Sequence, residues 1–106
     1  MTDAILKTPI TLDGLRAFRE EILALADRYG VFDVRVFGSV ARGEAQAGSD
    51  VDLLVSAREG VSVFDLVGLW QDLQNVLGCE VSLITDDDQP RNARFMQHAR
   101  KDAVPV

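Results

Sequence analysis

An apolar, strand-like segment, DVDLLVS at residues 50–56, begins with two carboxylates. Side chains alternate along a strand, so Asp50 and Asp52 would share one face, about 7 Å apart along the backbone. The other face would carry the apolar side chains Val51, Leu53 and Val55. Burying an unpaired carboxylate is costly, so the face with the aspartates must be open to water or to a cation. The segment is therefore either the polar edge of a sheet or a site for a metal ion.

The rest of the chain alternates between helical and strand-like patterns. Apolar residues recur at steps of three and four in the helical segments and at alternate positions in the strand-like ones. The predicted helices are 12–29, 63–77 and 90–100, the predicted strands are 31–37, 50–56 and 79–85, and the turn GSVARG after the first strand opens a short helix. This order predicts an α/β (α+β) fold in two layers, a small mixed β-sheet with helices packed on one face. The 106 residues suit a single domain, 1–106.

Capping residues mark the ends of these helices. Thr11 is a candidate N-cap of the first helix, and Gly30 is placed to end it at C′. Ser62 and Asp65 have the spacing of a capping box at the start of the second long helix, and Gly78 follows its last residue.

Charge and composition limit the partners of the chain. A formal net charge of −6 argues against direct binding of DNA, which depends on Lys and Arg neutralising phosphates, and it favours a basic or neutral protein partner. No apolar run approaches the roughly 20 residues of a membrane span, so we expect no membrane contact and a cytoplasmic location. The single cysteine, Cys79, is expected to be a small buried hydrophobe in a reducing compartment.

Gly38 and Ser39 stand at the exit of the first predicted strand. A glycine there lets the backbone approach a phosphate closely, and successive N–H groups can cradle an anion. The Ser39 hydroxyl and the Arg42 guanidinium would then reach phosphate oxygens. Mg²⁺ takes only one or two protein carboxylates and completes its shell with water and substrate phosphates. With Asp50 and Asp52, these residues predict a site for a metal–nucleotide complex.

The spacing of Gly38-Ser39, ten residues, and Asp50-x-Asp52 resembles the signature of the DNA polymerase β nucleotidyltransferase superfamily. In size, and in the run FGSVARGEAQAGSDVDLLV, the chain is similar to the minimal nucleotidyltransferases (MNT), the antitoxins of HEPN–MNT toxin–antitoxin pairs. The resemblance covers nearly the whole chain.

That resemblance implies a mixed-sheet palm, two Mg²⁺ ions, ATP as donor, and transfer of AMP to an acceptor hydroxyl. The implied acceptor is a tyrosine of a HEPN-type toxin, which is silenced by the modification, and a hetero-oligomer with that partner is compatible with this function. Matched to the family's motif, Gly38 and Ser39 would hold the triphosphate. Asp50 and Asp52 would be the catalytic, metal-binding pair, and Arg42 would lie nearby.

The third predicted strand departs from the family's pattern. The family carries a third carboxylate there, and in LGCEVSLIT this position is Ser82. A serine can neither offset metal charge nor act as general base for an incoming hydroxyl. Glu80, about 7 Å away on the same strand face, is either a substitute metal ligand or an exposed charge.

Three functions therefore remain open. The first is AMP transfer to a protein partner, and the second is a catalytically weakened protein of the same fold that neutralises its toxin by binding alone. The third is a transferase for a small hydroxylated molecule, for which the chain is short because little remains to build a second substrate-binding domain.

Several of these residues also have a structural interpretation. A polar edge strand would explain the two aspartates, an N-cap would explain Ser39, and a surface pair with Glu44 would explain Arg42. The acidic run 86–88 is expected to be an N-cap and acidic turn before a helix rather than a metal cluster.

Two further groups are expected to be structural. His98 lies with Arg91 and Arg94 on one side of the last helix, which predicts a solvated face or a contact with an acidic partner. Trp70 and Phe64 are expected to lie in the core or to pack between helices.

Overall fold

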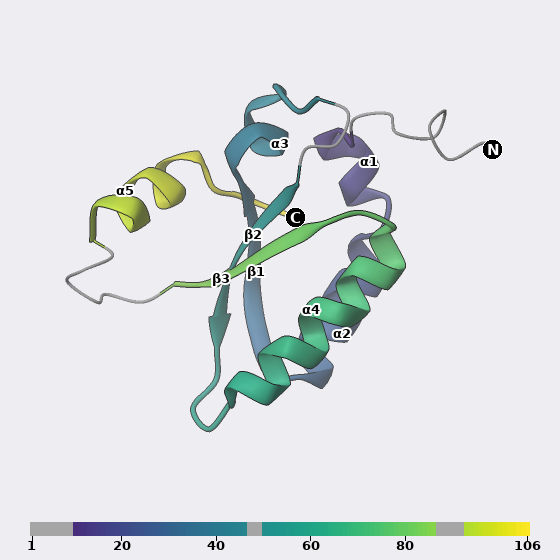
Figure 1. Ribbon diagram of the computed structural model, residues 1–106, viewed down its shortest axis with the longest axis vertical. Helices are drawn as coiled ribbons and strands as arrows, with labels where there is room; N and C mark the ends of the chain where they lie inside the picture. Colours follow the sequence, from purple (N-terminus) through teal and green to yellow (C-terminus); the bar gives the residue numbers. More distant parts are fainter. Residues whose placement is uncertain (1–9, 47–49, 87–92) are drawn as a thin grey trace.

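The computed structural model describes residues 10–46, 50–86 and 93–106. Its elements are α1 (Leu12–Arg16), α2 (Arg19–Arg28), β1 (Val31–Phe37), α3 (Gly38–Arg42), β2 (Val51–Ala57), α4 (Val63–Leu77), β3 (Val81–Thr85), α5 (Ala93–Asp102) and β4 (Val104–Pro105). The strands form one sheet in the order β3-β2-β1-β4, with β2 parallel to β3 and β1 antiparallel to β2 and β4 (Figure 1). The predicted α/β fold with a small mixed sheet is confirmed. No helix within these ranges is long and apolar enough to cross a membrane.

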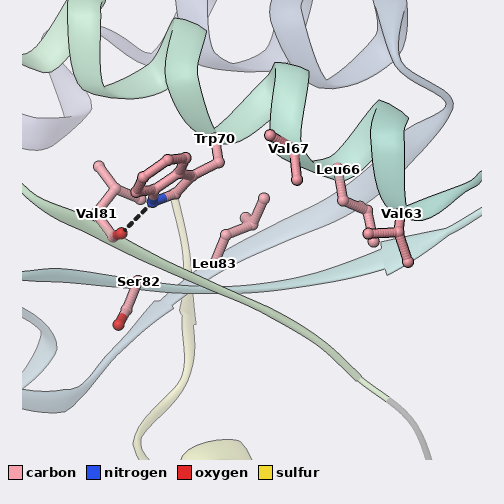
Figure 2. Close-up of a pocket in the computed structure, with 7 residues that line it drawn as sticks. All are labelled: Val63, Leu66, Val67, Trp70, Val81, Ser82 and Leu83. Atoms are coloured by element: carbon pink, nitrogen blue, oxygen red, sulfur yellow. Dashed lines mark hydrogen bonds between the residues drawn. The ribbon is translucent and has the colours of Figure 1, made fainter.

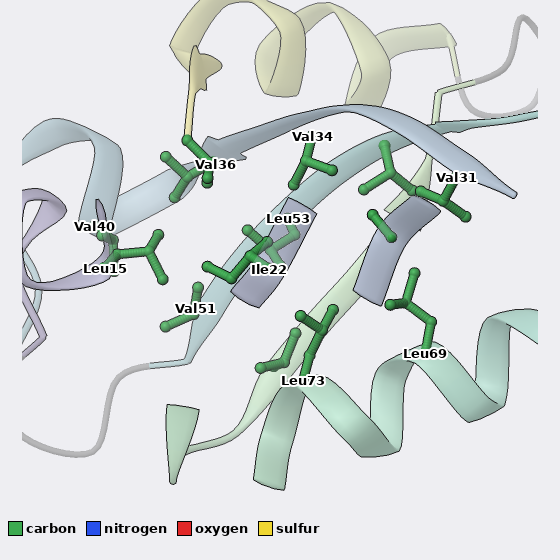
Figure 3. Close-up of a cluster of buried hydrophobic side chains, with 14 residues drawn as sticks. Leu15, Ile22, Val31, Val34, Val36, Val40, Val51, Leu53, Leu69 and Leu73 are labelled. Carbon is green, nitrogen blue, oxygen red and sulfur yellow. The ribbon is translucent and has the colours of Figure 1, made fainter. Parts of the chain in front are cut away.

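Helices α1, α2 and α4 cover one face of the sheet. Val51 and Leu53 of β2 are fully buried there, as the alternation predicts. They pack in one cluster with Leu15 of α1, Ile22 of α2 and Leu69 of α4 (Figure 3). Burial of one large aliphatic side chain contributes about 1.5–3 kcal/mol, so this cluster holds β2 firmly against the helices.

The opposite face of the sheet carries α5. Leu54 of β2 is buried there with Phe37 of β1 and with Met96 and Ala99 of α5, in a separate cluster. The expectation that helices pack on one face holds for α1, α2 and α4, and α5 is the exception. Its physical reason is the apolar patch that Phe37 and Leu54 form on this face, which needs a cover. The same face continues to Asp52, which is only half-buried.

The predicted helix 12–29 is divided into α1 and α2. The amide of Phe18 donates to the carbonyl of Leu15, three residues back, at 3.0 Å, which interrupts the regular i to i−4 pattern. The apolar stripe nevertheless continues across the break, because Leu15 and Ile22 are both fully buried. The turn between α1 and α2 therefore cannot be predicted from the spacing of apolar residues, because that spacing continues through it.

The predicted helix caps are confirmed. The Thr11 hydroxyl accepts a hydrogen bond from the first turn of α1 at 3.0 Å, and Gly30 has a left-handed φ of +79° after α2. Ser62 and Asp65 form both bonds of a capping box, and Gly78 ends α4 in the left-handed conformation. The bounds of α4 are those predicted, 63–77.

Strand β1 has its predicted bounds but contains an irregularity. Its pairing with β2 shifts register between Phe32 and Arg35, and Asp33 in this stretch has a φ of +53°. The extra residue allows both Val31 and Val34 to enter the same buried cluster, although strict alternation would place them on opposite faces.

Of the two aromatic residues on α4 that were expected to be packed, Trp70 is packed and Phe64 is exposed. The indole N–H of Trp70 donates to the carbonyl of Val81 at 2.6 Å, and its ring packs against the core. Phe64 is 86% exposed, so the expectation of a packed position is wrong for this residue. It falls outside the stripe of α4 that faces the sheet.

Cys79 is half-buried against the core, and burial raises the pKa of its thiol, which fits the expected small hydrophobe.

The last elements differ from the predicted ones in extent. The third strand begins at Val81 rather than at residue 79, and α5 extends to Asp102. The predicted helix start at Pro90, and Arg91, lie outside the described residues, while Arg94 and His98 are exposed as expected. Strand β4 was not predicted, because two residues that include a proline carry no strand pattern.

Asp86, just after β3, joins three elements of the fold. Its carboxylate accepts hydrogen bonds from Arg35 of β1, at 2.9 Å, and from Arg100 of α5. These two cations, Arg100 foremost, lower the pKa of the Asp86 carboxyl, although partial burial opposes the shift. Asp86 is thus part of an ion-pair network. Asp87 and Asp88, on which the expected helix cap and acidic turn also depend, lie outside the described residues.

We expect Asp86→Asn to lower the free energy of unfolding by about 1–2 kcal/mol at pH 7, because its charge-assisted hydrogen bonds with two arginines are weakened. The folded-state pKa of Asp86 is lowered, so its stabilisation is complete above the unfolded value of about 3.9 and is lost as the pH falls through the folded value. Urea unfolding at pH 7 and at acidic pH measures both effects. Glu59→Gln, at an exposed turn position, is the control. An equal loss in Asp86→Asn at both pH values would contradict this assignment.

Candidate functional site

The candidate site residues come from three neighbouring strands at one end of the sheet. Asp52 of β2 is paired in the sheet with Phe37, the last residue of β1, and with Ser82 of β3. Gly38 follows Phe37 directly, and Asp50 immediately precedes β2. The antiparallel pairing of β1 and β2 therefore brings the two halves of the sequence motif together.

Gly38 and Asp52 lie against one another. Gly38 has a left-handed φ of +73°, and a Cβ atom at this position would overlap Oδ2 of Asp52. Any other residue would have to adopt a strained backbone and also displace the carboxylate. The glycine of the Gly-Ser pair is thus required by the aspartate as well as by the turn.

The two aspartates are electrostatically unfavourable on their own. Partial burial, and then the charge of Asp50, raise the pKa of the Asp52 carboxyl, and the Arg42 cation lowers it in part. Such a pair favours a cation, because a bound cation relieves both the desolvation and the repulsion.

The donor set fits a magnesium ion that is shared with a phosphate ligand. The described ranges contain no group of three His, Cys, Asp or Glu side chains placed to hold a metal. Two carboxylates suffice for Mg²⁺ when water and substrate phosphates complete its octahedral shell. Asp50 and Asp52 are therefore the residues that would hold it.

Ser39 follows Gly38 in α3, the predicted short helix. Its side chain is half-buried, and its carbonyl accepts a hydrogen bond from the amide of Glu44 at 2.8 Å. Because α3 is only one turn long, it adds little helix dipole, and any phosphate contact would come from the hydroxyl and the local N–H groups.

Arg42 is held by two carboxylates. Its Nε donates to Glu44 at 2.9 Å and its Nη1 to Asp102 of α5 at 2.6 Å. These bonds raise the pKa of the guanidinium further. The surface pair with Glu44 is confirmed, and the predicted phosphate contact would require Arg42 to leave at least one of these partners.

Ser82 occupies the place nearest to Asp52 on β3, and Glu80 does not. Ser82 is the sheet partner of Asp52, whereas Glu80 is exposed and precedes the strand. The charges that shift the pKa of Asp52 are those of Asp50 and Arg42. The role of Glu80 as a metal ligand stays a prediction. To bind the metal, its side chain would have to extend toward Asp50 and Asp52.

A mixed sheet that sets a Gly-Ser turn against paired aspartates defines a nucleotidyltransferase type of protein. Residues 15–104 match the family described as nucleotidyltransferase domain. The chain belongs to this family, and it is an enzyme of the nucleotidyltransferase class, whose substrate is a nucleotide.

Its relatives carry more specific names. A protein of Methanocaldococcus jannaschii named as a protein adenylyltransferase is 39% identical over 72 residues, 68% of this chain and 77% of the relative. Protein adenylyltransferase MntA of Thermococcus cleftensis is 43% identical over 60 residues, 57% of this chain and 61% of MntA. The matched part is thus less than two thirds of that relative.

Solved structures match the fold over most of the chain. The structure of a minimal nucleotidyltransferase is 41% identical, with a TM-score of 0.76, and the match covers 91% of this chain and 96% of that one. A crystal structure of a toxin–antitoxin with AMP-PNP matches with a TM-score of 0.65 over 81% of this chain and 69% of that one. Its identity is 22%, so this second match shows a likeness of fold alone.

Sequence reasoning missed Asp102 as a neighbour of the site. It lies 60 residues from Arg42, on a helix that packs on the same face of the sheet as Asp52. The sequence around Asp102, a polar helix with basic residues just before it, does not indicate a contact with Arg42. That contact forms only when α5 packs on the sheet.

Gly38→Ala and Gly43→Ala form a matched pair. Both glycines have nearly the same φ, +73° and +74°, but nothing lies within 4 Å of a Cβ at Gly43. We expect each variant to lose about 1 kcal/mol from the left-handed backbone, and Gly38→Ala to lose at least about 1 kcal/mol more because it displaces Asp52. Only Gly38→Ala should also weaken Mg²⁺ binding, measured by calorimetry beside urea unfolding. Equal behaviour of the two variants would argue against the contact.

Proposed function

We propose that this chain is a Mg²⁺-dependent nucleotidyltransferase that transfers AMP from ATP to a hydroxyl of a protein partner, a HEPN-type toxin, and so acts as its antitoxin. The observation that carries the proposal is the close approach of Gly38 to Asp52, which brings the Gly-Ser turn, the part of the site proposed to bind phosphate, directly beside the two carboxylates. The protein adenylyltransferase names of two relatives support the choice of AMP and of a protein acceptor. The toxin–antitoxin structure with AMP-PNP supports a toxin as the partner and an adenine nucleotide as the donor.

In this proposal each half of the site has a separate task. Asp50 and Asp52 would hold Mg²⁺, which would supply positive charge to offset that of the triphosphate. The backbone at Gly38 and Ser39, with the Ser39 hydroxyl, holds the terminal phosphates. The acceptor oxygen forms a bond to the α-phosphorus, and the bond from that phosphorus to pyrophosphate breaks.

Arg42 would then exchange partners when the nucleotide binds. Its guanidinium is exposed, and its positive charge lowers the pKa of Asp52 in part. A triphosphate carries more charge than the carboxylates of Glu44 and Asp102, so it competes effectively for the same donors.

A second candidate function rests on Ser82. The sheet partner of Asp52 lacks the carboxylate that would take the proton of the acceptor hydroxyl. A protein with this site could bind Mg²⁺ and ATP and still neutralise its toxin by binding alone.

Asp52→Asn separates these two functions. We expect it to reduce transfer at least about 100-fold, because it removes a metal-binding charge worth several kcal/mol in the transition state. The assay uses ATP labelled on the α-phosphate, Mg²⁺, the purified chain and an extract of its native cells, and γ-labelled ATP distinguishes AMP transfer from phosphate transfer. Asp27→Asn, at an 82% exposed position of α2, is the control. Undiminished labelling by Asp52→Asn would refute the proposed site, and neutralisation of the toxin without labelling would favour binding alone.

Ser82→Asp tests the missing base. We expect it to raise the rate of transfer by about tenfold or more, because a positioned general base contributes about 10²–10⁴-fold. Ser82→Asn has nearly the same shape without the charge and should give no increase. If both variants transfer AMP at the parental rate, the proton is accepted elsewhere and Ser82 does not limit the reaction.

A further inference from the structure

A groove runs between α4 and β3, the edge strand of the sheet. Its volume is about 340 Å³, and its walls are Val63, Leu66, Val67 and Trp70 of α4 and Val81 and Leu83 of β3. Figure 2 shows the side chains of α4 turned toward Leu83, while the side chain of Ser82 points away from α4. The groove is open on its outer side, since Val63 is 71% and Val67 44% exposed, and Phe64 beside them is 86% exposed. Apolar side chains gathered at the surface in this way are typical of an interaction site.

The outer side of β3 presents backbone groups beside this groove. In a parallel pair, alternate residues of a strand make the bonds to its neighbour. The carbonyl of Glu80 accepts from the amide of Val51 at 3.0 Å, and the amide of Asp86 donates to the carbonyl of Val55 at 2.7 Å. The even-numbered residues therefore face β2, and the odd-numbered residues of β3 direct their N–H and C=O groups outward.

Side chains of α4 cover only the first of these outward residues. The amide of Val81 donates to Gln74 at 3.1 Å, and its carbonyl accepts from Trp70 at 2.6 Å. Within the part of the chain that the structure describes, the outward groups of Leu83 and Thr85 have no such cover. An open strand edge beside an apolar groove is a template for an added strand.

The charge around the groove indicates what kind of strand it accepts. Residues 59–85, which include all of α4 and β3, contain four Asp or Glu residues and no Lys, Arg or His. A second copy of the chain would bring the same acidic surface and a further net charge of −6, and would be repelled. A cationic segment would be attracted.

We propose that this groove binds an extended, apolar and basic segment of the protein partner, which adds as a fifth strand beside Leu83 and Thr85. Alternate apolar side chains of the segment fill the groove between Val67 and Leu83, and the intervening basic side chains meet the surrounding carboxylates. The added strand runs about 10 Å from Asp52, two strand spacings away, on the side of Ser82. This inference rests on the proposed function only in requiring a protein partner.

The probe is a fluorescent peptide of alternating Lys and Val, seven residues long, tested against the same peptide with Glu in place of Lys. We expect the lysine peptide to bind and to slow hydrogen exchange at the amides of Leu83 and Thr85. Val67→Lys places a positive charge in the groove at an exposed position, where it removes an apolar contact and repels the lysine peptide, so it should weaken binding by about tenfold or more. Leu23→Lys, at a 38% exposed apolar position of α2, is the matched control and should leave binding unchanged.

Asp52→Asn keeps this test separate from the transfer chemistry, because the variant should bind the lysine peptide as the parent does even if it transfers no AMP. Three results would each overturn the inference: no binding of the lysine peptide, equal binding of the glutamate peptide, or exchange at Leu83 and Thr85 that is unchanged by the peptide. Concentration-dependent dimerisation that Val67→Lys abolishes would also overturn it, because a second copy would then occupy the groove.

Discussion

The approach of Gly38 to the Asp52 carboxylate is the constraint on which the candidate site depends. It requires a residue without a side chain at the end of β1, and it requires β1 and β2 to pair with Phe37 opposite Asp52. A shift of one residue in that register would turn Asp52 into the buried cluster and Val51 out of it. The large aliphatic cluster on the other face therefore also secures the position of the carboxylate.

One face of the sheet serves two purposes because of the order of residues on β2. Leu54 needs a cover and receives α5, whereas Asp52, two residues earlier, stays open to a ligand. The docking of α5 also brings Asp102 to Arg42, so the cation whose charge acts on Asp52 is oriented by the same helix that completes the core on this side. Packing and site electrostatics are thus connected through one element.

The parts of the fold that local patterns determine were predictable, and those that depend on distant contacts were not. The bounds of α4 followed from Ser62, Asp65 and Gly78, which act within a few residues of themselves. The pairing of Asp-x-Asp with Gly-Ser was predictable because it joins consecutive strands. The turn that divides the first helix, the pairing of β4 with β1 and the two partners of Asp86 depend on tertiary packing, for which a single sequence carries no local signal.

The two contacts that shape the site differ greatly in the length of chain they close. Gly38 and Asp52 are separated by 14 positions (52 − 38), whereas the Arg42–Asp102 pair spans 60. By loop-closure entropy the longer contact costs about 1 kcal/mol more to form, and it must wait for α5 to dock. We therefore expect the turn and its carboxylate to assemble early with the central strand pair during folding, and Arg42 to acquire its orientation last. The same order in reverse makes the Arg42 contact the first part of the site to open under mild denaturant.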